Sequence, residues 1–143
     1  MTAKQYLRKY QQYKEDIVFY ESLKEDAIND VAGLKSPNLG ERVQTSPKKD
    51  PIGDLVIELE KDIAKYDMAI ISCRANMIII RNQIDKVQEE NEMYHKLLVY
   101  RYIIGLPWED IAKKMLMAVS SVKHFHSPAI ATFYNLFSEE IEK

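Results

Sequence analysis

The chain has 143 residues, 46% of them hydrophobic, and a formal net charge of −2, so any nucleic-acid binding must come from a local basic patch and not from bulk charge. Its single cysteine, Cys73, excludes an internal disulfide and fits a reducing compartment. The N-terminus lacks the apolar core of a signal peptide, and polar residues interrupt the apolar runs before they could span a bilayer. We therefore expect a cytoplasmic protein with no membrane partner.

A first helix is predicted over residues 2–34. Thr2 and Gln5 have the spacing of a capping box, and Gly33 lies near the expected end. Between them, large apolar and aromatic residues recur in steps of three and four, which is the spacing of one helix face. These inner-seam positions are Ala3, Tyr6, Tyr10, Tyr13, Ile17, Tyr20, Lys24, Ala27, Val31 and Leu34.

Residues 35–50 are predicted to form a loop, because Pro37, Gly40 and Pro47 stand among polar residues. The segment is somewhat basic through Arg42 and the Lys48–Lys49 pair. Two interpretations follow. The favoured one is a solvated turn, and the other is a contact with phosphate groups.

A second helix is predicted over 51–91, with Asp50 as its cap and Pro51 at a position where the missing amide donor costs nothing. Its inner seam has an apolar residue every 3.5 positions on average, the repeat of a left-handed coiled coil. The seam runs through Ile52, Val56, Leu59, Ile63, Tyr66, Ile70, Cys73, Met77, Ile80, Ile84, Val87, Asn91 and Tyr94. Two such helices around one loop predict a long antiparallel helical hairpin over residues 1–91.

Beside that seam, Ile57, Ala64, Ile71 and Ile78 recur every seven residues. The second helix therefore has apolar surface for more than one neighbour. We expect self-association through Ile57, Ile71 and Ile78, giving a homodimer in which two hairpins form a four-helix bundle.

After Asn91 the pattern changes, and residues 92–143 are predicted to form a separate small unit. A short helix ends at Gly105, and further short helices follow over 108–115, 120–126 and 129–141. Their apolar positions indicate a trihelical core, which is the layout of a helix-turn-helix unit. These positions are Leu98, Ile104, Trp108, Ile111, Met115, Val122 and Phe125.

The residues of this unit carry a family resemblance. They are Arg101-Tyr102-Ile103-Ile104-Gly105, then Trp108-Glu109-Asp110-Ile111-Ala112, and then Val122, His126 and Ala129. This series resembles region four of bacterial sigma factors as used in small phage transcriptional regulators of the ArpU/RinA-like group. The resemblance extends to the N-terminal segment and to residues 42–47, and so covers most of the chain.

The resemblance implies a transcriptional regulator of phage or prophage type that binds duplex DNA sequence-specifically, with RNA polymerase as a candidate partner. The second short helix would enter the major groove and present Val119, Ser120, Ser121, Lys123 and His124. Contacts with phosphates would come from Arg101, Lys113, Lys114 and His126. Between His95 and Phe137, five Lys or Arg residues face two acidic ones, an excess of +3.

The chain departs from the family pattern at three places, which are Leu116, Ala118 and Pro128. Leu116, Met117 and Ala118 stand where the turn usually has Gly, an aromatic residue and Ser. Because alanine cannot cap, we expect Ser120 to cap the next helix and to lengthen the turn. We expect Pro128 to end or kink the recognition helix, since it removes a backbone hydrogen bond.

These departures leave two alternative functions open. One is a helical interaction module that binds a host or phage protein and not DNA, and the other is a small packaging subunit of terminase type. No catalytic motif is recognised, so we expect no enzyme, no cofactor and no metal. For Trp108, a core anchor is the preferred interpretation and a base-stacking group the alternative. For Cys73, packing in the seam is preferred to a role as nucleophile. His124 and His126 are expected on different faces of their helix.

Overall fold

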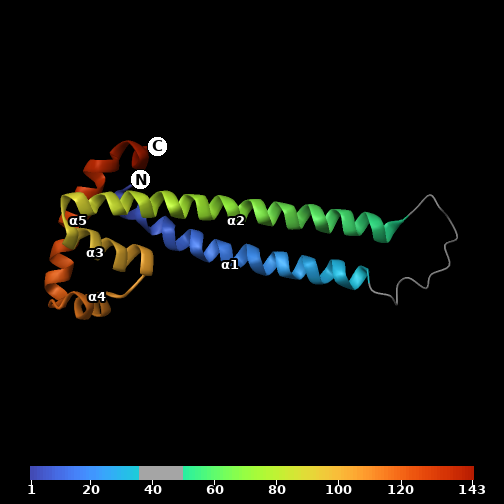
Figure 1. The fold of residues 1–143 in the computed structure, drawn as a ribbon, viewed down its shortest axis with the longest axis horizontal. Coiled ribbons are helices and arrows are strands. Elements are labelled where there is room, and N and C mark those ends of the chain that lie inside the picture. Colours follow the sequence, from blue (N-terminus) through green and yellow to red (C-terminus); the bar gives the residue numbers. More distant parts are fainter. Residues whose placement is uncertain (36–49) are drawn as a thin grey trace. The chain divides into compact units, whose positions relative to one another are not determined.

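The computed structural model describes residues 1–35 and 50–143, and within them it is all-helical, with no strand (Figure 1). This confirms the all-α part of the predicted fold class. The helices are α1 (Ala3–Leu34), α2 (Pro51–Glu90), α3 (Glu92–Leu98), the π-helix η2 (Val99–Ile104), α4 (Trp108–Met115) and α5 (Val119–Glu142). The two interpretations offered for Arg42, Lys48 and Lys49 concern residues outside the described part of the chain.

The predicted starts of the long helices are confirmed by side-chain hydrogen bonds. The Thr2 amide donates to Gln5 Oε1 (2.9 Å) and the Gln5 amide to Thr2 Oγ1 (3.1 Å), which is a complete capping box. At α2, Asp50 Oδ1 accepts from the Gly53 amide (2.9 Å). Asn91 starts α3, because its side chain accepts from the Tyr94 amide at 3.1 Å. The chain therefore leaves α2 at the polar residue that interrupts the seam.

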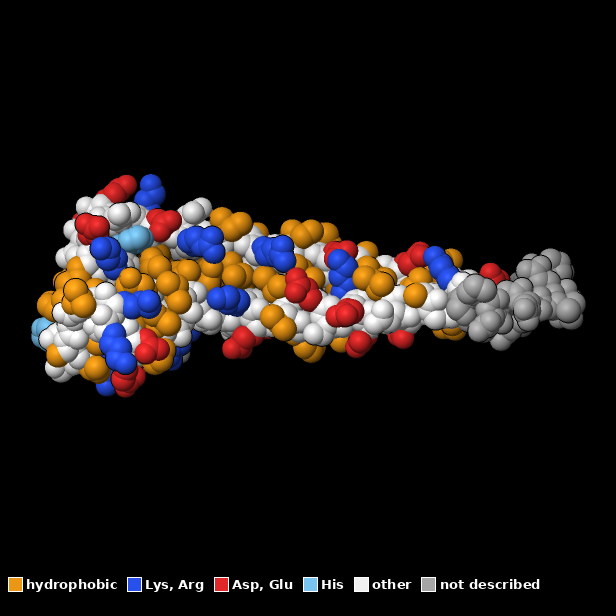
Figure 2. All heavy atoms as spheres, turned by 60° about the horizontal axis from the view of Figure 1, so that its bottom comes forward, with side chains coloured by type: hydrophobic (Ala, Val, Ile, Leu, Met, Phe, Trp, Pro, Cys, Tyr) orange, Lys and Arg blue, Asp and Glu red, His pale blue; other side chains and the backbone are white. Residues whose placement is uncertain are grey.

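The spacing of three and four also predicts which sides of the long helices are buried. Every inner-seam position of α1 and α2 is buried or half-buried, including the lysine at position 24. Ile57, Ala64, Ile71 and Ile78 are all exposed on α2. Figure 2 shows exposed hydrophobic side chains at intervals along the long helices, among Lys, Arg, Asp and Glu.

Contacts divide the chain into two compact units, Met1–Lys14 with Arg74–Lys143 (unit 1) and Glu15–Cys73 (unit 2). In unit 2, Lys24 Nζ meets Asp67 Oδ1 at 2.6 Å and Lys35 Nζ meets Glu60 Oε1 at 3.4 Å. Lys35 follows Lys24 along the chain, but its partner Glu60 precedes Asp67 along α2. The two segments therefore run in opposite directions within this unit.

The sequence suggested a boundary near Asn91, and the structure groups the residues differently. The first turns of α1 and the last turns of α2 belong to unit 1 together with α3, η2, α4 and α5. The physical reason is a shared core, in which Leu7, Ile84, Leu97 and Phe133 are fully buried. The assignment of residues 1–91 to self-association and 92–143 to DNA binding stays a prediction.

Polar contacts fasten α1 within unit 1. The Tyr6 hydroxyl donates to Gln83 Oε1 (2.6 Å), which gives the buried Gln83 a partner. Gln11 Nε2 donates to the carbonyls of Tyr102 (3.0 Å) and Ile103 (2.8 Å) at the end of η2. These bonds satisfy carbonyls that the helix itself leaves free.

The turn between α4 and α5 corrects the expectation for Ser120. Ala118 begins α5 with no side-chain cap, and Ser120 lies inside the first turn, so the turn is not lengthened. Leu116 adopts the left-handed conformation at φ 55° and ψ 47°. The Met117 amide reaches the Ala112 carbonyl (3.0 Å) and the Leu116 amide that of Lys113 (3.3 Å). This is a Schellman end, which usually has glycine where Leu116 stands.

The expectation that Pro128 ends or kinks the recognition helix is wrong. α5 continues through Pro128, and its non-helical residue is Phe137, at φ −131° and ψ 28°. Pro128 deletes one backbone donor, but Val122 and Ala129 are buried on either side of it. The burial of this face outweighs the loss of one hydrogen bond.

Leu116 gives a direct test of the turn. Its side chain is 93% exposed, so Leu116→Gly loses no packing and relieves the left-handed strain. The relief is partly offset by the greater freedom of glycine in the unfolded chain. We expect the free energy of unfolding, measured with urea, to rise by about 0.5–1 kcal/mol. Leu116→Ala keeps the strain and should leave stability nearly unchanged; a variant with glycine that is less stable than the alanine variant would contradict this account.

Candidate nucleic-acid interface

The candidate interface consists of α4, the turn after it and the first turns of α5, all in unit 1 (Figure 1). Ile111 and Ala112 on α4 and Val122 on α5 are buried in one core, which fixes the two helices against each other. α4 itself is strongly amphipathic, with acidic residues in its first turn and Lys113 and Lys114 in its last. That order of charges suits the helix dipole.

The start of α5 presents a polar surface to solvent. Ser120, Lys123 and His124 are exposed, whereas Val119 and Ser121 are half-buried. The structure therefore brings the predicted base-contacting residues onto one helical segment, and three of them are fully available to a partner. His124 and His126 lie on different faces, as expected, since the former is exposed and the latter buried.

The predicted phosphate contacts have three different environments. Lys113 and Lys114 are exposed, as a phosphate contact requires. Arg101 is half-buried, its Nη1 donates to the Leu106 carbonyl (3.1 Å), and its guanidinium lies 4.2 Å from the centre of the Trp108 ring. Arg101 thus holds the connection before α4 in place, in addition to any external role.

His126 is corrected, because the structure places its ring inside unit 1. The residue is 9% exposed, and its Nε2 lies 2.7 Å from the Tyr102 hydroxyl. The ring also stacks on Tyr102 and meets the edge of Trp108. Burial, together with the positive charges of Lys4, Arg101 and Arg8, lowers the pKa of His126 to about 4. A neutral, buried ring cannot hold a phosphate, so His126 is removed from the interface.

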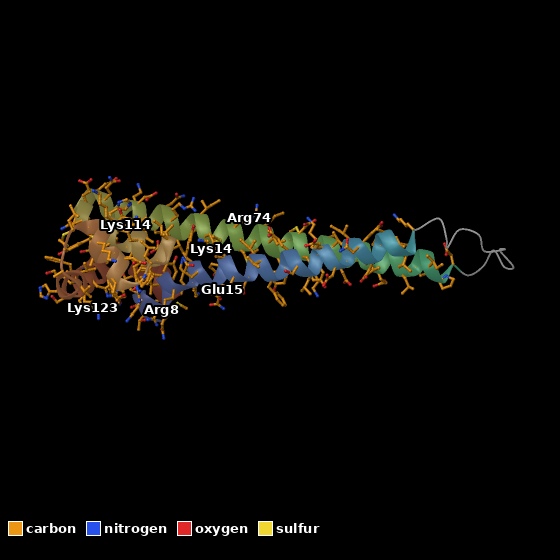
Figure 3. All side chains as sticks on the ribbon, turned by 90° about the horizontal axis from the view of Figure 1, so that it is seen from below. Arg8, Lys14, Glu15, Arg74, Lys114 and Lys123 are labelled. Atoms are coloured by element: carbon orange, nitrogen blue, oxygen red, sulfur yellow. The ribbon has the colours of Figure 1, made fainter. Side chains whose placement is uncertain are left out.

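The same electrostatics reveal two residues that the sequence did not single out. Lys4 and Arg8 are exposed on α1, and their charges act on His126 of α5. Figure 3 shows Arg8 projecting from α1 and Lys123 from α5. Their spacing in the sequence places them on one helix face, because Lys4 and Arg8 are four residues apart and each follows a buried residue, Ala3 or Leu7. The seam periodicity of α1 predicts a hairpin and does not by itself point to this exposed face.

A groove of about 420 Å³ lies in unit 1 between α3, η2 and the end of α4. Its lining is mixed: flexible thioethers and an aromatic ring alternate with two ammonium groups and one carboxylate, and it includes Met93, Met117, Tyr100, Lys96, Lys114 and Glu92. The exposed Leu116 lies at its edge. This groove differs from the polar surface of α5 because thioethers and an aromatic ring lie beside its charged groups.

Other kinds of site have little support in the described residues. No group of three or more His, Cys, Asp and Glu side chains there could hold a metal ion. Cys73 is buried, and burial followed by the charge of Asp16 raises the pKa of its thiol, which makes it a poor nucleophile. No helix within 1–35 and 50–143 is long and apolar enough to cross a membrane.

Comparisons with protein-family models, curated proteins and solved structures found no match for this chain. The interface therefore has to be judged by its own residues.

The pKa of His126 predicts how stability depends on pH. A pKa of about 4 in the folded chain, against 6.5 in the unfolded one, means that the unfolded state binds more protons between these values. Stability should therefore fall as the pH falls from about 6.5 towards 4, by on the order of 2 kcal/mol from this group.

The measurement is urea unfolding of the native chain and of His126→Gln at pH 7, 5.5 and 4. The glutamine can still bond the Tyr102 hydroxyl but does not titrate, so its stability should decline less over this range. The carboxylates change the free energy of unfolding equally in both proteins, so their contribution cancels when the two values at each pH are subtracted. Parallel decline of the two proteins would show that His126 does not carry the effect.

Proposed function

We propose that this protein is a duplex-DNA-binding transcriptional regulator of phage or prophage type. The single observation that supports this best is the start of α5, where Ser120, Lys123 and His124 are exposed while Val122 is anchored in the core. Lys113 and Lys114 lie at the end of the helix that packs on it. A polar helix face flanked by cations is what major-groove binding requires.

In the proposed complex, α4, its turn and α5 act as a helix-turn-helix unit with α5 in the major groove. Lys123 would donate to the O6 and N7 acceptors of guanine, and Ser120 and His124 would contact neighbouring base edges. Lys113, Lys114 and Arg101 would contact phosphates. Lys4 and Arg8 are added to this set, since α1 brings their charges towards α5.

The long helices would supply self-association. We propose that α1 and α2 form an antiparallel coiled-coil hairpin and that two hairpins join as a homodimer. The support is the pair of opposite contacts in unit 2 and the exposure of Ile57, Ile71 and Ile78, each more than half exposed. Isoleucines at this spacing along a helix favour a partner helix over water.

One observation favours a second candidate, a module that docks onto a protein. The methionine-lined groove beside Leu116 offers an adaptable apolar contact that DNA would not use. The two functions differ in their sensitive residues. Met93→Ala, on α3 and outside the helix-turn-helix, should weaken docking of a protein partner while leaving DNA affinity unchanged. Lys123→Ala on α5 should do the opposite.

The main test is DNA binding by the double variant Lys114→Ala/Lys123→Ala. The ligand is duplex DNA from the region upstream of the neighbouring genes, and binding is followed by fluorescence anisotropy between 50 and 200 mM salt. Removal of two phosphate or base contacts should weaken binding strongly at low salt. The slope of log affinity against log salt should fall in magnitude by about 1 for each bound copy, because Lys114 contacts a phosphate and Lys123 a base.

A matched control removes two lysines from unit 2. Lys35→Ala/Lys61→Ala changes the net charge equally and disrupts only exposed ion pairs, which contribute little to stability. This control should bind with nearly native affinity and slope. The proposal fails if the native chain does not bind duplex DNA at 50 mM salt, or if the two double variants bind alike.

A further inference from the structure

We propose that α2 pairs with α2 of a second copy in antiparallel orientation, through a surface here called the outer stripe. This inference rests on the self-association part of the proposed function and adds the helix that forms the contact and its direction. The outer stripe comprises five residues of α2 that follow one another in steps of four and three. They are Ala64, Met68, Ile71, Ala75 and Ile78, and all five are exposed.

The outer stripe is a second coiled-coil seam on a helix that already has one. At 100° per residue, its centre lies roughly 140° around α2 from the inner seam that includes Ile70 and Met77. The inner seam is buried within the chain, whereas Met68 and Ile71 remain 66% and 59% exposed. Two regular seams on one helix are typical of a helix with two helical neighbours, and the described chain supplies one.

The direction of pairing follows from the charges along one edge of the stripe. Glu60 and Asp67 occupy this edge in the first half, and Arg74 and Arg81 occupy the equivalent positions in the second half. In an antiparallel pair, this edge of one copy faces the same edge of the second copy. The start of the edge in one copy then lies beside its end in the other. Acidic residues of one copy then meet basic residues of the second copy.

A parallel pair would bring different positions together. In a parallel pair, each residue of this edge faces the residue five positions later in the second copy, on the other edge of its outer stripe. Glu60 would meet Lys65, which is favourable, but Arg81 would meet Lys86, which is repulsive. The charges therefore favour the antiparallel arrangement, while the apolar stripe supplies the area that holds the copies together.

One register satisfies both charge pairs. Positions 60 and 67 are one heptad apart, as are 74 and 81, so the alignment that places Glu60 beside Arg81 also places Asp67 beside Arg74. The same alignment sets Met68 beside Ile71 of the second copy and Ala64 beside Ala75. The two alanines leave room for the helix backbones to approach closely. Glu60 and Asp67 already meet Lys35 and Lys24 of their own chain at 3.4 and 2.6 Å. Arg81 donates to the Tyr10 hydroxyl at 2.6 Å. Contacts with the second copy would therefore extend existing polar pairs into networks.

The test is disulfide cross-linking of the full chain with cysteines at Ala64 and Ala75. Ala64→Cys and Ala75→Cys chains, one carrying a tag of distinct mass, are oxidised separately and as a mixture. An antiparallel pair sets position 64 beside position 75 of the second copy but roughly 16 Å along the axis from the second copy's 64. A disulfide needs Cα atoms within about 7 Å.

The mixture should therefore give at least ten times more covalent dimer, of mixed mass, than either variant alone. The native chain is the background, because Cys73 is buried in the inner seam. Efficient cross-linking of each variant with itself would mean parallel pairing and would overturn the inference. Absence of any covalent dimer, including from a mixture of Met68→Cys and Ile71→Cys chains, which the same register sets side by side, would overturn it too.

A second measurement keeps folding and association apart. Ile71→Glu lies on the outer stripe, and Leu55→Glu places the same charge at a similarly exposed site (59% and 54%) on nearly the opposite side of α2. In sedimentation equilibrium, Ile71→Glu should raise the dimer dissociation constant at least 100-fold with an unchanged helical circular dichroism spectrum. Leu55→Glu should change it little; equal effects of the two would contradict the outer stripe.

Failure of this inference and failure of the proposed function give different results. A chain that binds DNA but cross-links in parallel would retain the regulator proposal and reject the antiparallel pair. A chain that cross-links as described but shows no affinity for duplex DNA would do the reverse.

Discussion

Unit 1 depends on burial of the last turns of α2 against the first turns of α1. Ile84 and Val87 from α2 and Leu7 from α1 are fully buried, and they share one core with Leu97 and Phe133. α3 and α4 have seven and eight residues, too few to be stable alone in water. The candidate DNA-binding helices therefore depend on the long helices for their stability. A fragment that began at Asn91 would lack one side of its core.

The stack that links η2, α4 and α5 explains why two predicted contact residues have internal roles. Arg101 covers Trp108, Trp108 meets His126, and His126 bonds Tyr102. An Arg or His in a sequence suggests a partner outside, but here the rings of Tyr102 from η2 and Trp108 from α4 supply that partner. The arrangement also makes Trp108 a structural anchor, as the sequence suggested. The exposed surface that the proposed DNA contact would use is then Lys113, Lys114 and the polar start of α5.

The features predicted well from the sequence are those that depend on local order. Steps of three and four identify the buried faces of α1 and α2, because side chains at that spacing lie on one side of a helix. Thr2, Asp50 and Gly105 mark helix ends through their own chemistry. The rest depends on residues distant in sequence. The burial of His126, the position of Lys4 near α5 and the continuation of α5 through Pro128 follow from packing against other helices, which periodicity does not describe.

An antiparallel pairing of α2 would constrain how a dimer uses its DNA. In the register set by Glu60 and Arg81, residue 90 of one copy lies level with residue 51 of the other, at the start of α2. The two ends of α2 that lead into α3 are then separated by roughly 60 Å along the helix axis, at 1.5 Å per residue. Adjacent major-groove sites on one face of DNA are about 35 Å apart, and the next are about twice that. A dimer of this kind would favour half-sites two helical turns apart over adjacent ones, because the long helix fixes a separation that short helix-turn-helix dimers do not reach.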